Sequence, residues 1–87
     1  MAFAKLYGEG DNQVLVKLDE GEEGPEVRYY FQPPNLGVCS VAAVFPDTDE
    51  GWDRAQAAFD RTTEEIARRV VEEQNSQIIS RLQADRP

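Results

Sequence analysis

The residues of this chain that are best suited to bind a charged partner are five carboxylates around one glycine-rich turn. They are Asp19, Glu20, Glu22, Glu23 and Glu26, and no basic residue stands among them. Such a cluster can imitate a phosphate backbone and attract a basic groove on a nucleic-acid-binding protein. The same run is also typical of a solvated hairpin tip, and the sequence leaves both interpretations open. A second acidic group, which fits helix capping or a second binding cluster, consists of Asp47, Asp49, Glu50 and Asp53.

The residue types needed for most enzyme chemistry are missing. The chain has no histidine, so Ser-His and Cys-His nucleophilic pairs cannot form. Its single cysteine, Cys39, can supply neither a structural zinc site nor an intramolecular disulfide. The six glycines match neither a P-loop nor a dinucleotide-binding fingerprint. The sequence therefore predicts a protein without enzymatic activity, metal or cofactor.

The charge balance restricts the class of partner. Seventeen acidic and nine basic residues give a net charge of -8. This charge repels nucleic acid and anionic membranes, and it attracts basic proteins. Residues 1–5 hold no apolar run of the length found in signal peptides, and no stretch reaches the roughly eighteen apolar residues that a membrane span needs. We therefore expect a cytoplasmic protein with a protein partner, no direct contact with nucleic acid and no membrane association.

The elements that must position these carboxylates follow from the hydrophobic period, which changes near residue 46. Before this point apolar residues recur at every second position, as in Val14, Val16, Leu18, Val27, Tyr29 and Phe31. After it they recur at every third or fourth position, as in Trp52, Ala55, Phe59, Ile66 and Val70. Period two predicts strands, and a period near 3.6 predicts a helix. We therefore predict an α+β fold, with a three- or four-stranded antiparallel β-meander packed on one long C-terminal helix and followed by a short apolar segment.

The boundaries divide a single domain of residues 1–87 into three parts. The meander covers 1–46, with strands at 2–7, 13–19, 26–32 and 38–45; the long helix covers 47–74; and 75–87 form a tail or a short helix. Thr48 or Asp49 is the expected N-cap of the helix. Thr62 and Glu65 also fit a capping box, so the helix could restart there. Trp52, Phe59, Ile66 and Val70 are expected to pack on the sheet.

Two apolar segments have no place in this simple packing. Residues 38–45 are apolar at almost every position, which indicates a central strand or a strand with one face in a subunit interface. Ile78, Ile79 and Leu82 fall off the stripe of the long helix. Because soluble monomers rarely expose such surfaces, we expect a homodimer. The residues predicted for self-association are Val41, Ala43, Phe45, Ile78, Ile79 and Leu82.

The sequence from Val27 to Ser40, together with Asp49 to Asp53, resembles small uncharacterised proteins carried by bacteriophages and prophages. In size, acidity and strand-then-helix order the chain is also similar to phage inhibitors such as anti-CRISPR proteins, without sharing a motif with them. The resemblance implies a binder directed at a host protein. We therefore predict a small acidic binding protein that inhibits a basic, nucleic-acid-binding host protein. The alternative is a self-assembling structural or accessory phage protein.

Overall fold

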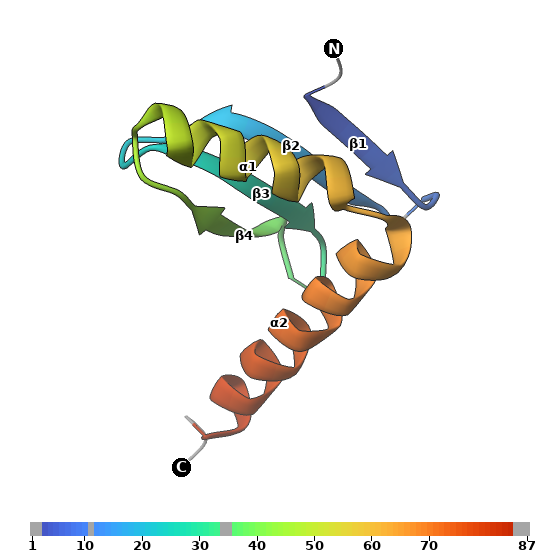
Figure 1. Cartoon of the computed structure of the whole chain (residues 1–87). Coiled ribbons are helices and arrows are strands. Elements are labelled where there is room, and N and C mark those ends of the chain that lie inside the picture. Colours follow the sequence, from blue (N-terminus) through green and yellow to red (C-terminus); the bar gives the residue numbers. More distant parts are fainter. Residues whose placement is uncertain (1–2, 11, 34–35, 85–87) are drawn as a thin grey trace.

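The protein is an α+β domain with four strands followed by two helices (Figure 1). The computed structural model describes residues 3–10, 12–33 and 36–84, with the backbone alone for 75–84. The strands are β1 (Ala4–Tyr7), β2 (Val14–Glu20), β3 (Pro25–Phe31) and β4 (Cys39–Val44), and the helices are α1 (Asp49–Arg61) and α2 (Glu64–Ala84). The predicted fold class and the antiparallel meander are confirmed, with four strands.

The strands lie side by side in chain order, and each pairs antiparallel with the next. Val16 stands opposite Tyr29, and Val27 stands opposite Ala43. Alternation along each strand points one set of side chains toward the helices. The buried core consists of Val14, Val16, Leu18, Val27, Ala55, Phe59 and Ala67. The apolar residues of period two therefore form the inner face of the sheet, as predicted.

Helix α1 lies across this inner face, over β2 and β3 (Figure 1). Its N-cap is Thr48, whose hydroxyl oxygen accepts a hydrogen bond from the Gly51 N–H at 3.0 Å, as the sequence predicted. Gly51 is required there, because a Cβ at this position would collide with the carbonyl group of Pro46. Ala55 and Phe59 are the buried residues that follow on the sheet-facing side.

The prediction of one long helix over 47–74 is wrong, because the helix stops at Thr62. The Thr62 backbone is extended (φ -67°, ψ 127°), and its N–H donates to the Phe59 carbonyl oxygen. The Thr62 hydroxyl donates to the Ala58 carbonyl oxygen at 2.9 Å, which satisfies a second helix-end acceptor. Thr63 then caps α2, since its hydroxyl oxygen accepts from the Ile66 N–H at 3.3 Å. The predicted alternative of a helix restart is confirmed, but the N-cap is Thr63, and Thr62 caps the end of α1 instead of forming a capping box with Glu65.

The break changes which residues of the second helix face the core. Ile66 was predicted to be buried but is 39 % exposed, whereas Ala67 is completely buried. Val71, rather than Val70, packs against the core cluster. Trp52 is only half-buried. Residues 75–84, which were predicted to form a tail or a short separate helix, instead continue α2 to Ala84, and residues 85–87 lie outside the described residues.

Strand β4 forms one edge of the sheet, so the interpretation of residues 38–45 as a central strand is wrong. Val44 is 48 % exposed, and Val38 just before the strand is 72 % exposed. Within the described residues, neither helix combines the length and the apolar character that crossing a bilayer requires.

Candidate acidic interface

The glutamates at the centre of the acidic run occupy the tip of the β2–β3 hairpin. The Gly21 N–H donates to the Gly24 carbonyl oxygen at 2.9 Å, and the Gly24 N–H donates back to the Gly21 carbonyl oxygen at 3.3 Å. This pair of bonds closes a loop of two residues, Glu22 and Glu23, both of which are exposed. Gly24 has φ +144°, a conformation that side-chain-bearing residues rarely adopt.

The hairpin tip packs directly on the connection between β4 and α1. A Cβ on Gly24 would lie 2.3 Å from the Phe45 carbonyl oxygen and 3.0 Å from the Asp47 nitrogen. The Phe45 N–H also donates to the Pro25 carbonyl oxygen at 2.9 Å. The β2–β3 turn and the start of α1 are therefore neighbours, although more than twenty residues separate them in the chain.

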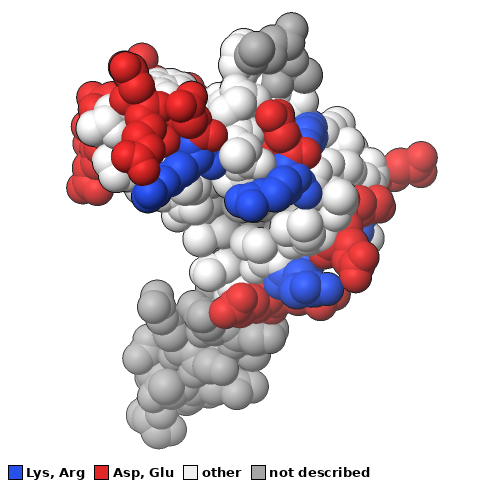
Figure 2. All heavy atoms as spheres, in the orientation of Figure 1, with Lys and Arg blue, Asp and Glu red and all other residues white. Residues whose placement is uncertain are grey.

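This contact brings both acidic groups of the sequence to one end of the molecule. Figure 2 shows acidic side chains gathered where the β2–β3 turn and the start of α1 lie. The exposed carboxylates of this region, called here the acidic end, belong to Asp19, Glu20, Glu22, Glu23, Asp47, Asp49, Glu50 and Asp53. Only Glu50 among them forms an ion pair within the described residues, with Arg54 at 2.6 Å.

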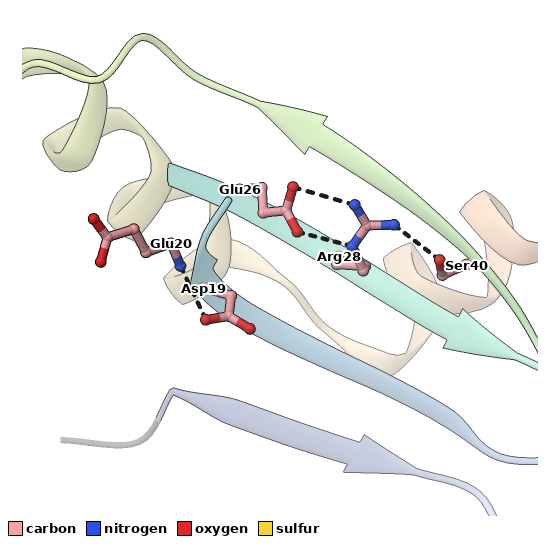
Figure 3. A network of polar contacts seen from close by, with 5 residues as sticks. All are labelled: Asp19, Glu20, Glu26, Arg28 and Ser40. Carbon is pink, nitrogen blue, oxygen red and sulfur yellow. Dashed lines mark hydrogen bonds and ion pairs between the residues drawn. The ribbon is translucent and has the colours of Figure 1, made fainter. Parts of the chain in front are cut away.

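Glu26 has a different role from the other four carboxylates predicted for partner binding. Its two carboxylate oxygens accept hydrogen bonds from Nε and Nη2 of Arg28, at 2.8 and 3.2 Å (Figure 3). Nη1 of Arg28 donates to the Ser40 hydroxyl at 2.8 Å. The hydrogen bond to Glu26 raises the pKa of Arg28 above its ordinary value. The side chain of Glu26 is only 13 % exposed, and this carboxylate already forms an ion pair within the domain.

The remaining turn carboxylates surround a hollow of about 490 Å³. It is lined by Glu20, Gly21, Glu22, Glu23, Glu26, Arg28 and Val44. Asp19, which precedes Glu20 in the chain, is held by a local contact, because its Oδ1 accepts from the Glu20 N–H at 2.9 Å (Figure 3). The hollow is thus acidic at the hairpin tip and apolar at Val44, and the Glu26–Arg28 ion pair forms one of its walls.

Sequence reasoning missed two residues of this site, Arg28 and Val44. The signal for Arg28 was present, since it stands two residues after Glu26 and must share its face of the strand. Val44 stands opposite Glu26 in the β3–β4 register, a relationship that no local pattern reveals.

Of the six residues predicted for self-association, the structure describes the side chains of three. Val41 is half-buried and Ala43 is exposed, both on the helix side of β4, because they pair with Tyr29 and Val27. Phe45 packs against the protein's own core. Ile78, Ile79 and Leu82 belong to α2, but their side chains lie outside what the structure describes.

Comparisons of this chain with protein-family models, with curated proteins and with solved structures found no match. Among the described residues, no three cysteine, aspartate or glutamate side chains come together as a group that could hold a metal ion. The geometry of the acidic end must therefore carry the functional argument.

Proposed function

We propose that this protein is a non-enzymatic binder whose acidic end occupies a basic groove on a protein partner. The observation that carries the proposal is the hollow at the β2–β3 turn. Glu20, Glu22 and Glu23 line it and form no ion pair within the described residues. The one cation in its wall, Arg28, already binds Glu26. Three exposed carboxylates are thus left for an external cation.

The hollow suits a lysine or arginine side chain of that partner. Carboxylates form their strongest hydrogen bonds with charged donors, and arginine can bind a carboxylate through two parallel bonds. Val44 offers an apolar contact for the aliphatic stem of such a side chain. The other carboxylates of the acidic end extend the negative field and accelerate encounter with a basic surface.

A basic partner of this kind is typically a nucleic-acid-binding protein, because such proteins carry clustered lysine and arginine. The acidic end would compete with the phosphate backbone for the same groove. The proposal therefore includes inhibition of a nucleic-acid-binding host protein by a phage-encoded protein, in the reducing cytoplasm.

The test uses an arginine-rich peptide as a defined basic probe. The triple variant Glu20→Gln, Glu22→Gln, Glu23→Gln removes the free carboxylates of the hollow. The control, Glu9→Gln, Glu72→Gln, Glu73→Gln, removes three exposed charges outside the acidic end. We expect the hollow variant to bind about tenfold more weakly at low ionic strength, with unchanged thermal stability, because exposed charges contribute little to folding but steer association.

High salt should reduce this difference, because the Debye length shortens. Equal weakening in the two triple variants would show that net charge alone attracts the peptide, and the proposed site would be wrong. Competition between this protein and DNA for a captured bacterial protein would extend the test to inhibition.

A second candidate function is self-assembly, as a structural or accessory phage protein. Strand β4 favours it, because this edge strand contains no charged residue and exposes Val44. The mass of the native protein in solution tests this second function, because a self-assembling chain exceeds the chain mass of 9.8 kDa.

A further inference from the structure

We infer that β4 is the surface at which a second copy of this chain adds its own β4 in antiparallel orientation, with the two-fold axis at Ala42. The two sheets would join into one sheet of eight strands. This inference specifies the self-assembly proposed above and rests on it, but it is independent of the acidic-end proposal.

The unpaired backbone groups of β4 follow from the β3–β4 register. The Phe45 N–H donates to the Pro25 carbonyl oxygen, so residue 45 faces β3. In an antiparallel pair every second residue faces the neighbouring strand, and the residues between them face away. Ser40, Ala42 and Val44 therefore point their N–H and C=O groups outward from the sheet. Within the described residues, no hydrogen bond from another element reaches these backbone N–H and C=O groups.

The edge also lacks the protections that usually prevent strand addition. Edge strands are commonly blocked by charged side chains, proline, bulges or short length. Cys39–Val44 contains no charged residue and no proline, and it pairs continuously with β3 over six residues. The opposite edge, β1, has four residues and carries Lys5. Strand β4 is accordingly the better template for an added strand.

The outward-facing residues specify one register. Ser40, Ala42 and Val44 are evenly spaced about Ala42. A two-fold axis at Ala42 therefore gives the outward N–H and C=O groups of all three residues a hydrogen-bond partner in the other copy. Ala42 then exchanges both of its hydrogen bonds with Ala42 of the second copy, and Ser40 does the same with Val44 of the second copy. Any other antiparallel register leaves at least one outward residue of each strand unpaired. Val41 would stand opposite Ala43 of the second copy.

Charge favours the antiparallel orientation. The acidic end adjoins the Val44 end of β4, because Glu26 pairs with Val44 and Asp47 follows shortly after it. In an antiparallel pair the two acidic ends lie at opposite ends of a six-residue strand, which is about 20 Å long. This separation exceeds the physiological Debye length of about 8 Å. A parallel pair would place two strongly negative regions side by side.

Cysteine cross-linking tests the register in the native full-length chain. In a Cys39→Ser background, Ala42→Cys places two thiols across the axis, where the Cα atoms of a hydrogen-bonded pair are about 5.5 Å apart, within disulfide range. The matched control, Ser40→Cys, places two thiols about 13 Å apart along the strand. We expect mild oxidation to cross-link most of the first variant and little of the second. Equal cross-linking in both would overturn the register.

Blocking variants test the interface itself by sedimentation. Ala42→Pro removes an outward N–H and no bond to β3, so the monomer is expected to fold. Ala42→Glu places a carboxylate opposite Arg28 within its own sheet. Across the two-fold axis the same carboxylate would stand opposite the carboxylate of the second copy, and the two would repel each other. We expect wild type at twice the chain mass of 9.8 kDa, and both variants at the chain mass with native circular dichroism.

The outcomes separate this inference from the proposals above. A wild type that remains monomeric at high micromolar concentration would overturn both self-assembly and the β4 pairing. A dimer that persists in both blocking variants would overturn the β4 pairing and leave self-assembly standing. Neither result would bear on the peptide binding of the acidic end.

Discussion

Nζ of Lys5 donates a hydrogen bond to the carbonyl oxygen of Phe59 at 2.6 Å. The same ammonium group donates to the Thr62 carbonyl oxygen at 3.1 Å and lies 4.6 Å from the centre of the Phe59 ring. The Tyr7 hydroxyl also donates to the Thr62 carbonyl oxygen. The first strand thus supplies the cation and the donors that satisfy the C-terminal carbonyl groups of α1, where the helix dipole is negative. This contact fixes the chain at the point where α1 ends and α2 begins.

We predict that Lys5→Met lowers the free energy of unfolding by about 1–3 kcal/mol. The methionine keeps an apolar stem over the Phe59 ring but leaves part-buried carbonyl oxygens without a charged donor. The control is Lys17→Met, since Lys17 is also half-buried but its side chain forms no hydrogen bond or ion pair within the described residues. Urea unfolding followed by circular dichroism measures both variants. Equal stability of the two would show that the Lys5 contacts contribute nothing to the fold.

A second prediction concerns the position of the core along the two helices. Phe59→Ala should lower the free energy of unfolding by about 3–5 kcal/mol, because the ring is 1 % exposed and its removal leaves a cavity. Ile66→Ala should lower it by less than about 1 kcal/mol, because this side chain is largely outside the core. A single uninterrupted helix would make both changes costly, so a large effect of Ile66→Ala would contradict the break at Thr62. Thermal or urea unfolding distinguishes the two results.

The third prediction concerns the contact that assembles the acidic end. Gly24→Ala should destabilise the protein by about 1–3 kcal/mol, because the residue has φ +144° and its new Cβ would meet the backbone of the β4–α1 connection. Gly37→Ala is the matched control, since nothing lies within 4 Å of a Cβ built there. Unfolding curves and the β2–β3 amide shifts report the change. A neutral Gly24→Ala would mean that the hairpin and the start of α1 are not in close contact.

The strands, their order and the start of the first helix could be predicted from local patterns in the sequence. The alternation of Val14, Val16 and Leu18 is a local property, and a side-chain period of two has one structural meaning wherever the strand lies. The Thr48 cap is equally local, because its partner is the Gly51 N–H three residues away. These features need no knowledge of distant residues, so the meander, the start of α1 and the acidic hairpin tip were all predictable.

Features that depend on residues far apart in the chain could not be predicted from these local patterns. Local signals allowed α1 either to continue through Thr62 or to stop there, and in the folded chain Lys5 from β1 binds the carbonyl groups of the stop. Because α1 ends at Thr62 and α2 begins anew, Ala67 rather than Ile66 is buried in the core. Likewise, only the close approach of Gly24 to the Phe45 carbonyl oxygen joins the two acidic groups into one end. The physical reason is common to these cases: a periodic pattern fixes the face of an element, whereas its ends and neighbours are fixed by hydrogen bonds and packing across the whole fold.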